Sequence, residues 1–475
     1  MGFLFFQQKS EKEIKISKWL IIIPIIIILF SRIIPLLGNK VPLGYDTGIY
    51  KKFIEDFAEA LPNLPDFNSG KSVIQEPIGL YLIADLLHLL GFNGNQILFG
   101  FCIFFDLLLG LGIYSVVKKY FNLNAAILAF FVFSISITQF QTYYFLYYKN
   151  ILALFLMLMV IWLLKEKSYL VIPVAAFLGG VHQMTFFIFG LTMFITFVFS
   201  REKKYYLISG FFILILAVSF YIKNPGTILN LLPEINIFSL ISSSNKAYSG
   251  RFFDFSVYTQ IAAFYLIFSV LGFIHLIKEK RFDYLFFWYL LNLLIIFSGF
   301  YFYNRFIVHF DIIAAILAGF AISLIINKVL PTGYGQLAVL FFVLGTIYFL
   351  FNNVLSTKPL ISKEELAEIR SLEQTTEENA FLISSISHYS PWLFGYSGRK
   401  IIAPGMFEYD TKWTEEEWYI FWQTENQNIR QQLLDRYKRP LYIFVGDIDP
   451  YQLKFKFSSD PSFQKISQRV FQYKK

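Results

Sequence analysis

Residues 19–50 read WLIIIPIIIILFSRIIPLLGNKVPLGYDTGIY, a long apolar run that leads into a short polar turn. The run from about Trp19 to Leu37 is long enough to cross a bilayer as a helix, which takes about 20 apolar residues. It follows several lysines and lacks a small-residue cleavage site, so we expect a retained first span with a cytoplasmic N-terminus. These lysines are Lys9, Lys12, Lys15 and Lys18.

The composition of the whole chain agrees with a membrane protein. Hydrophobic residues make up 56% of the 475 residues and charged residues 16%, whereas soluble domains carry about a quarter charged residues. The single cysteine, Cys102, lies inside an apolar run, which excludes an intramolecular disulfide and a cysteine metal site. Much of the net charge of +8 lies in short turns between apolar runs, so we interpret it as a topology signal rather than as a nucleic-acid surface.

The remaining apolar runs predict an all-α polytopic fold with about eleven transmembrane helices. After the first span they cover approximately 95–117, 123–139, 150–164, 169–182, 184–200, 205–222, 257–277, 283–300, 306–327 and 334–352. Basic residues fall on every second turn between these runs, which places those turns in the cytoplasm. They are Lys118, Lys119, Lys165, Lys167, Arg201, Lys203, Lys204, Lys278, Lys280, Arg281 and Lys328. A further span at 77–90 would reverse this pattern, so we expect residues 77–90 on the outer surface.

Two amphipathic helices are predicted in the first outer loop, residues 38–94. The apolar face of the first consists of Ile49, Phe53, Phe57 and Leu61. The second begins at Glu76-Pro77, where proline suits the first turn of a helix, and it carries Asp85 and His88 within an apolar pattern. Both patterns are typical of interfacial helices that lie on a bilayer.

The last part of the chain changes to the mixed-charge composition of a soluble domain. Two pairs have the spacing of capping boxes that begin helices, namely Ser362 with Glu365 and Thr414 with Glu417. Residues 380–384 and 441–445 are short apolar runs typical of buried strands. We therefore predict a transmembrane domain, 1–352, and a small C-terminal extracytoplasmic α/β domain, 353–475, in a multi-pass protein of the plasma membrane.

The turn Gly44-Tyr45-Asp46 places an acid at the membrane surface directly after the first span. Ionisable groups are costly at such positions and usually functional. Other polar residues are predicted at the same depth, and a carboxylate that accepts a hydroxyl proton beside cations that neutralise a departing phosphate suits glycosyl transfer from a lipid-phosphate sugar. The candidate catalytic residues are Asp46 and Glu76, and the candidate substrate-binding residues are Tyr45, Lys149, His182, Arg251, Tyr303 and Arg305.

These residues also have structural interpretations. Asp46 and Glu76 stand at predicted helix starts, where acids cap a helix or complement its dipole. Arg305 could mark the membrane boundary, and His182 could satisfy a helix end. An aromatic belt would account for the tyrosines of one outer turn, Tyr143, Tyr144, Tyr147 and Tyr148. The tail tryptophans could stack on carbohydrate but are more often core residues: Trp392, Trp413, Trp418 and Trp422.

A metal requirement stays open at this stage. The histidines show no metal-ligand spacing with any partner, which disfavours zinc. No second acid follows Asp46 two residues later, and this weakens the prediction of a divalent metal without excluding one.

The order of these features resembles the C superfamily of integral-membrane glycosyltransferases, which includes protein O-mannosyltransferases, aminoarabinose transferases of lipid A and oligosaccharyltransferases. The resemblance rests on three segments: Gly44-Tyr45-Asp46, Glu76-Pro77-Ile78-Gly79-Leu80-Tyr81, and Tyr303-Asn304-Arg305-Phe306 followed by Asp311. It implies a sugar donor on a polyprenyl or dolichyl phosphate, with Asp46 as the base or a metal ligand and Arg305 at the donor phosphate. The tail lacks the Trp-Trp-Asp-Tyr-Gly motif, which argues against an asparagine acceptor.

The sequence thus favours a membrane glycosyltransferase that transfers a sugar from a polyprenyl-phosphate-linked donor to a glycan, lipid or protein acceptor outside the cytoplasm. A transporter or lipid-linked-sugar flippase is the main alternative, although it should show inverted repeats and ionisable residues near the bilayer midplane. We detect no internal repeat. A scaffold or polymer-assembly subunit without catalysis is the third alternative, and in it Asp46 would be dispensable.

Overall fold

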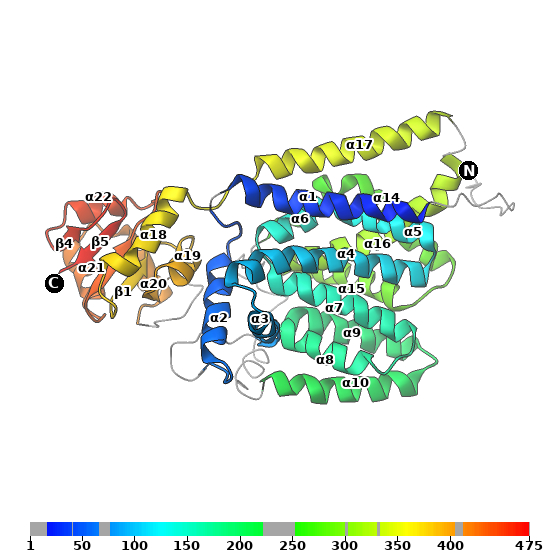
Figure 1. Ribbon diagram of the computed structural model, residues 1–475, viewed down its shortest axis with the longest axis horizontal. Coiled ribbons are helices and arrows are strands. Elements are labelled where there is room, and N and C mark those ends of the chain that lie inside the picture. Colours follow the sequence, from blue (N-terminus) through cyan, green and yellow to red (C-terminus); the bar gives the residue numbers. More distant parts are fainter. Residues whose placement is uncertain are drawn as a thin grey trace.

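The structure, a computed structural model, describes residues 17–39, 41–65, 77–221, 252–299, 303–329, 333–403 and 412–474, with only the backbone given for 327–329. Figure 1 shows two parts, a bundle of long, roughly antiparallel helices and a smaller C-terminal part that contains the sheet. The bundle begins with η1 (Lys18–Ile21) and α1 (Ile22–Gly38), and α17 leads from it into the C-terminal part.

The helices of the bundle follow the predicted apolar runs. They are α4 (Phe101–Tyr120), α5 (Leu123–Ile135), α6 (Ile137–Tyr144), α7 (Tyr148–Lys165), α8 (Val171–Val181), α9 (Gln183–Phe199), α10 (Lys203–Val218), α13 (Phe255–Ile261), α14 (Ala263–Lys278), α15 (Tyr284–Ser298), α16 (Phe306–Val329) and α17 (Gly333–Ser356). Three short helical turns accompany them: η2 (Gln96–Gly100), η3 (Ser219–Tyr221) and η5 (Tyr303–Arg305).

These helices confirm a mostly helical, multi-pass membrane protein. Among the described residues, six helices are long and apolar enough to cross a membrane, or up to eight if each of two bent pairs is one span. The bent pairs are α5 with α6, at 53°, and α13 with α14, at 97°. The predicted count of eleven stays a prediction.

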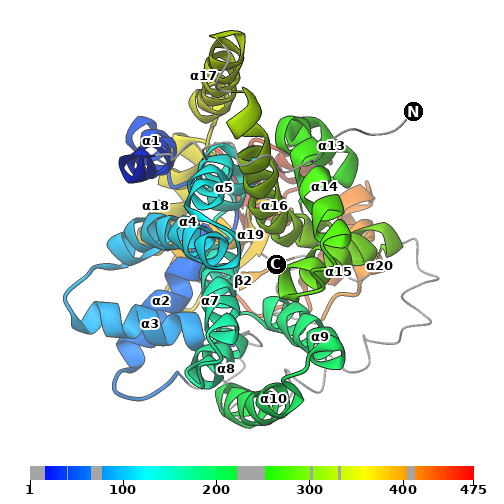
Figure 2. The ribbon, with the colours of Figure 1, turned by 90° about the vertical axis from the view of Figure 1, so that its right-hand side faces the viewer.

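The centre of the bundle is α16, which packs against α5, α14 and α15. A Cβ added at Gly319 would lie 2.2 Å from the backbone nitrogen of Ala129, so α16 and α5 approach as closely as small residues permit. In Figure 2, α17 and α10 lie at the outer edge of the bundle. Large apolar side chains on both, such as Phe341 and Leu214, are exposed, as expected of surfaces that face lipid.

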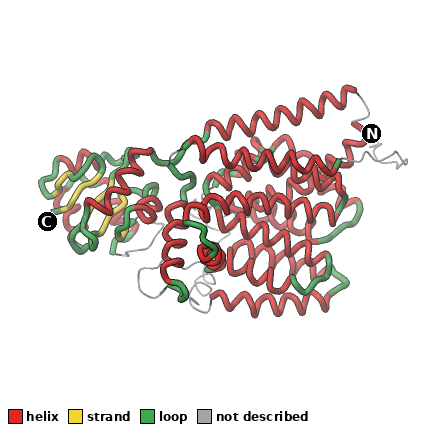
Figure 3. Tube along the Cα trace, in the orientation of Figure 1, coloured by secondary structure: helices red, strands yellow, loops and turns green. Residues whose placement is uncertain are grey.

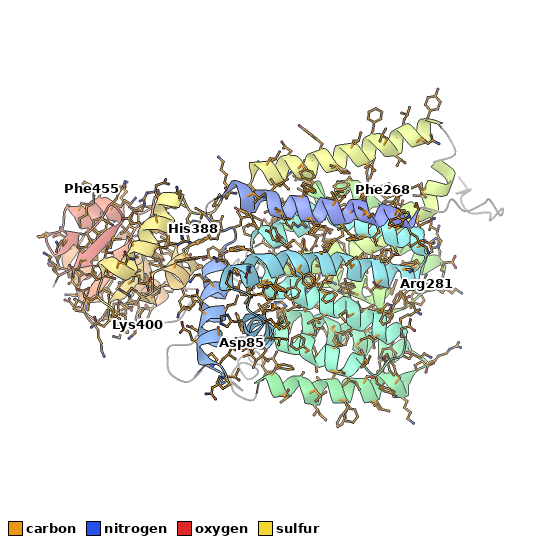
Figure 4. The ribbon with its side chains drawn as sticks, in the orientation of Figure 1. Asp85, Phe268, Arg281, His388, Lys400 and Phe455 are labelled. Atoms are coloured by element: carbon orange, nitrogen blue, oxygen red, sulfur yellow. The ribbon has the colours of Figure 1, made fainter. Side chains whose placement is uncertain are left out.

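The basic turns predicted to lie in the cytoplasm come together at one end of the bundle. Lys119 pairs with Glu166, and Lys167 pairs with Glu202. Arg281 donates to the backbone oxygen of Tyr120 at 3.1 Å, and Figure 4 places Arg281 at the end farthest from the C-terminal part. We call these turns, 118–120, 165–167, 201–204 and 278–283, the basic end.

Two helices, α2 (Thr47–Ala60) and α3 (Gly79–Leu89), lie across the opposite end of the bundle, next to the C-terminal part (Figure 1). We call this the domain end. The apolar face of α2 was predicted to lie on the bilayer, but Phe53 and Phe57 are buried against Tyr81 of α3. On α3, by contrast, Asp85 lies on the buried face, which raises the pKa of its carboxyl to about 6. The sequence pattern alone did not distinguish this burial from an exposed position.

The C-terminal part is a five-stranded sheet between two layers of helices, and the strands appear in yellow in Figure 3. The strands are β1 (Phe381–Ser384), β2 (Lys400–Ile402), β3 (Leu441–Phe444), β4 (Phe463–Lys465) and β5 (Val470–Tyr473), in the order β2-β1-β3-β5-β4. The helices are α18 (Lys363–Thr375), α19 (Ser390–Tyr396), α20 (Glu415–Gln423), α21 (Gln427–Leu434) and α22 (Leu453–Ser458). β2, β1 and β3 run parallel, whereas β5 and β4 pair antiparallel.

Local sequence signals account for much of this part. Both predicted capping boxes form, at the start of α18 and of α20. The predicted apolar runs become β1 and β3, whose side chains are nearly all buried. The α/β prediction for the C-terminal part is therefore confirmed.

Candidate functional site

The backbone conformation of the turn that carries Asp46 requires a glycine at position 44. Gly44 has φ +87°, and a Cβ added there would lie 2.6 Å from the Cβ of Leu146. Only glycine adopts this conformation in so little space. The hydroxyl of Thr47 donates to the backbone oxygens of Leu43 and Gly44 and so closes the turn.

Asp46 stands at the N-cap position of α2, half-buried. Its backbone oxygen accepts the first helical bond from the nitrogen of Tyr50 at 3.0 Å. Its side chain, however, makes no capping hydrogen bond to the helix. The interpretation of this carboxylate as a helix cap is therefore wrong.

The C-terminal part supports this turn directly. A Cβ added at Gly48 would lie 1.8 Å from the backbone oxygen of Pro391, so the backbones of α2 and α19 touch. The ring of Phe53 also packs edge-on against Phe394, at 5.7 Å between centroids. Tyr45 donates its hydroxyl to the backbone oxygen of Ser387 at 2.7 Å. The acid turn is consequently held from both sides, by the bundle and by the sheet domain.

Two of the predicted substrate-binding cations, Lys149 and Arg305, and the candidate His182 are near one another. Lys149 is only 4% exposed, and its ammonium lies 4.7 Å from the ring centroid of Tyr81 on α3. The guanidinium of Arg305 lies 5.8 Å from the ring centroid of Tyr147. The ring of His182 lies within electrostatic range of both cations.

One short segment, residues 145–149, joins the acid turn to the cations. Gly44 packs against Phe145 and Leu146, and the next residues of the segment include the ring beside Arg305 and the buried Lys149 itself. The segment is the junction between α6 and α7, and Leu146 has a φ of +56° there. We call residues 44–46 together with Lys149, His182 and Arg305 the acid–cation site.

The tyrosines near this segment are not an aromatic belt. Tyr143, Tyr147 and Tyr148 are each at most 8% exposed. The hydroxyl of Tyr143 donates to the backbone oxygen of Arg32 at 2.9 Å, and that of Tyr148 donates to the backbone oxygen of Ile97 at 2.7 Å. The belt interpretation is wrong for these three residues, because their side chains are buried inside the protein and the hydroxyls of Tyr143 and Tyr148 donate to backbone oxygens.

His182 caps α9, as its helix-end interpretation predicted. Its Nδ1 accepts the backbone N–H of Thr185 at 3.2 Å, and it lies 2.8 Å from the hydroxyl of that residue. The same hydroxyl lies 3.2 Å from Nε2 of His309. An Nδ1 that accepts a backbone N–H leaves the neutral ring proton on Nε2. His182 can therefore cap α9 through Nδ1 and still offer its Nε2 proton near the two cations.

The structure describes only some of the remaining candidates. Glu76 and Arg251 lie outside the described residues, as does the apolar loop segment 231–240. Tyr303 is half-buried in η5 and packs against the apolar core. The adjacent Asn304 donates to the carboxylate of Asp254 at 3.1 Å and so ties η5 to the start of α13. The ligand roles of Tyr45 and Tyr303 stay predictions.

Sequence reasoning missed a buried ion pair. Nε of Arg32 on α1 lies 2.9 Å from the carboxylate of Asp106 on α4, and both side chains are at most 1% exposed. The only available signal was an ionisable residue inside each of two apolar runs. Asp311 faces protein, since its carboxylate accepts from three groups, the Ser136 hydroxyl, the Gln139 amide and the Tyr265 hydroxyl.

Three of the four tail tryptophans are core residues. Trp392, Trp413 and Trp418 are at most 6% exposed, which confirms the structural interpretation for them. Trp422 is partly exposed. Within the described ranges, no group of three or more His, Cys, Asp or Glu side chains could hold a metal ion, so we derive no step through one.

Comparisons with known proteins place the fold. No family model and no curated protein matches the sequence. Solved structures do match. The apo oligosaccharyltransferase of Archaeoglobus fulgidus aligns with a TM-score of 0.62 at 14% identity, over 90% of this chain and 69% of that one. ArnT of Cupriavidus metallidurans bound to undecaprenyl phosphate aligns with a TM-score of 0.63 at 11% identity, over 96% and 98%.

A third alignment covers nearly the same share of each chain as the first. The complex of the Archaeoglobus oligosaccharyltransferase with zinc and sulfate has a TM-score of 0.63 at 14% identity, over 90% of this chain and 68% of that chain. The chain therefore has the fold of these solved structures, an oligosaccharyltransferase and ArnT.

Proposed function

We propose that this protein is a membrane glycosyltransferase, which transfers a sugar from a polyprenyl-phosphate-linked donor to an acceptor outside the cytoplasm. The observation that carries the proposal is the acid–cation site. The acid turn, whose carboxylate makes no capping hydrogen bond to α2, is connected to the buried Lys149 by one segment, 145–149, at the domain end. A buried cation is costly, so the position of Lys149 next to a segment that contacts the acid turn supports a function for it.

In this mechanism Asp46 acts as the base. Its carboxylate accepts the proton of the acceptor hydroxyl, and the acceptor oxygen then attacks the anomeric carbon from the face opposite the phosphate. A new carbon–oxygen bond forms while the bond from that carbon to the phosphate oxygen breaks, and the configuration inverts. The polyprenyl phosphate departs with the bonding electrons.

The cations take up the charge of the leaving group. Lys149 and Arg305 stabilise the negative charge that develops on the phosphate, and they do so inside a partly buried site where such charges interact strongly. Arg305 suits a phosphate because its planar guanidinium offers several parallel donors. His182 contributes a neutral N–H donor. Glu76 would orient the acceptor or supply a second acid.

The proposed topology follows from the same arrangement. Eight candidate spans, counted with each bent pair as one, plus the three shorter apolar helices α8, α9 and α15 give eleven, and α3 lies outside them on the domain end. With a cytoplasmic N-terminus, the basic end faces the cytoplasm and the sheet domain lies outside. We place the domain boundary near residue 352, where α17 approaches its end at Ser356.

The solved structures of the same fold support the donor class. One holds ArnT with undecaprenyl phosphate, and another holds the archaeal oligosaccharyltransferase with dolichol-phosphate and an inhibitory peptide. We carry over the lipid phosphate as the donor carrier. The acceptor class stays open between glycan, lipid and protein, and the zinc of one such structure leaves a divalent metal open as well.

A transporter or flippase explains the buried ionisable residues less well. Asp311 accepts three hydrogen bonds, and Arg32 is paired with Asp106. A transported substrate would have to displace these short-range partners. Fixed pairs of this kind suit helix packing, whereas the acid–cation site lies at one end of the bundle.

The proposal is tested with a panel of radiolabelled polyprenyl-phosphate sugars, given to membranes that contain the protein and to membranes without it. We expect one donor to lose its sugar and to release polyprenyl phosphate in equal amount. Donor that stays intact, or that merely crosses the bilayer in sealed vesicles, would contradict a transferase and favour the flippase.

A further inference from the structure

An exposed aromatic surface lies on the C-terminal part. The rings of Trp422 and Tyr451 stack with centroids 5.2 Å apart and planes inclined by only 2°. Tyr419 meets Trp422 edge-on at 5.5 Å and is 47% exposed. Trp422 and Tyr451 are themselves partly exposed, unlike the buried tryptophans of the same domain. We call Tyr419, Trp422 and Tyr451 the aromatic platform.

The platform lies at the carboxyl edge of the parallel strands. Trp422 donates its indole N–H to the backbone oxygen of Ser385, directly after β1, at 2.7 Å. Tyr451 follows β3, the neighbour of β1. From β1 the chain continues to β2 on one side and later to β3 on the other, which makes this edge a topological switch point. Ligands of open α/β sheets bind in the crevice at such a point.

This edge faces the acid turn. The backbone oxygen of Ser387 accepts the hydroxyl of Tyr45 at 2.7 Å, and that of Ser385, two residues earlier, accepts the indole of Trp422. Two residues of extended chain span about 7 Å. The platform is thus joined to Tyr45, the neighbour of Asp46, through one short segment. The hydroxyl of Ser385 is buried, and no described residue forms a hydrogen bond with it.

We propose that the aromatic platform is the acceptor subsite and that the acceptor is a carbohydrate. This inference rests on the proposed glycosyltransferase function. A pyranose ring has an apolar face of C–H groups that packs on an aromatic ring, and tyrosine and tryptophan add a polar edge for its hydroxyls. A glycan held on the platform would extend one hydroxyl toward Asp46, while the donor phosphate occupies the cations on the other side of the turn.

A peptide acceptor fits the platform less well. The charged groups beside it include the ammonium of Lys456, which donates to the backbone oxygen of Trp422 at 3.1 Å and pairs with the carboxylate of Glu425, so these charged neighbours already have partners. The parallel rings of Trp422 and Tyr451, with paired charges beside them, suit the apolar face of a sugar ring better than a specific charged side chain. The platform therefore assigns a neutral oligosaccharide as the acceptor class.

The test compares variants of the full-length protein in lipid nanodiscs. The acceptor probes are fluorescently labelled mannotriose and chitotriose, and a small alcohol, glycerol, serves as an acceptor too small to use the platform. We expect Tyr451→Ala to raise the acceptor KM at least tenfold for one labelled trisaccharide. Transfer to glycerol and the donor KM should stay at wild-type values, and Tyr451→Phe should bind like the wild type.

The matched control is Phe455→Ala. Phe455 is 73% exposed on the same domain, and Figure 4 places it at the end away from the helix bundle, opposite His388. An unchanged acceptor KM in Tyr451→Ala, or an equal rise in Phe455→Ala, would overturn the subsite. Transfer to a peptide with no transfer to either trisaccharide would overturn it as well.

Failure of the subsite is distinguishable from failure of the proposed function. If the wild type consumes no donor, trisaccharide binding is still measured by the quenching of tryptophan fluorescence. Binding that Trp422→Phe and Tyr451→Ala both weaken would keep the carbohydrate site while the transferase fails. Normal donor turnover without trisaccharide binding would keep the transferase and reject the subsite.

Discussion

The two ends of the bundle both carry positive charge, but they hold it in different ways. At the basic end, surface ion pairs form, as between Lys167 and Glu202, whose side chains are 58% and 52% exposed. At the domain end, Lys149 is 4% exposed and lies against an aromatic ring. Exposed pairs contribute little to stability and serve mainly to orient the chain. A buried cation is costly, so its position indicates a function.

The largest expected difference in turnover is between two variants that each remove one cation, one at each end of the bundle. We expect Lys149→Met to lower the kcat for donor turnover by about a hundredfold or more, the order lost when one charge-stabilising group is removed from a catalytic site. Lys167→Met should change turnover less than twofold. Initial rates at saturating acceptor measure both, and equal losses in the two variants would remove the distinction between the ends.

The close contact of α2 with α19 predicts a structural effect of the next size. Gly48→Ala places a methyl group where the Pro391 oxygen lies 1.8 Å away, so either the backbone shifts or the two parts separate. Overpacking of this kind costs about 1–3 kcal/mol. We expect a lower Tm together with reduced turnover, because the acid turn moves with α2.

The control for this contact is Gly94→Ala. No atom lies within 4 Å of a Cβ added at Gly94, so its Tm and turnover should match the wild type. Wild-type behaviour of Gly48→Ala as well would contradict the role of the C-terminal part in holding the acid turn.

The smallest expected effect concerns the buried acid of α3. Burial raises the pKa of Asp85 to about 6 in the folded protein, from 3.8. The folded state therefore binds the proton more tightly, and this contribution to stability is lost as the pH rises through 6. Asp85→Asn should raise Tm at pH 8 and leave it nearly unchanged at pH 4.

The exposed Asp56 on α2 provides the comparison for Asp85. Its carboxylate is paired with Lys52 on the helix surface, so Asp56→Asn should not produce a gain in Tm that grows with pH. Thermal unfolding in nanodiscs at several pH values measures both variants. A gain for Asp85→Asn that does not depend on pH would show that the charge of Asp85 is not the cause.

The sequence predicted those features that depend on local pattern. Apolar runs predicted the helices of the bundle, and the alternation of basic turns predicted that these turns lie together at one end. The capping boxes predicted the starts of α18 and α20. The site candidates Lys149, His182 and Arg305 were found because each lies beside the end of an apolar run, and the ends of neighbouring spans come together in a bundle.

Long-range contacts were beyond that kind of reasoning. The contact of Gly48 with Pro391 joins residues that no local signal relates, and the same is true of the pairing of Arg32 with Asp106. Tyr143, Tyr147 and Tyr148 were misassigned because aromatic residues near a predicted interface have the same pattern whether they face lipid or protein. The structure separates these cases through burial and through the acceptors of the tyrosine hydroxyls.

The most direct test of the account compares two acids of the same helix region, Asp46→Asn and Asp56→Asn, in the donor turnover assay. The first keeps the shape of the side chain but removes the base, and the second removes an exposed carboxylate from the surface of α2. We expect turnover to be lost in Asp46→Asn alone, while labelled donor still binds. Equal turnover in the two variants would contradict it.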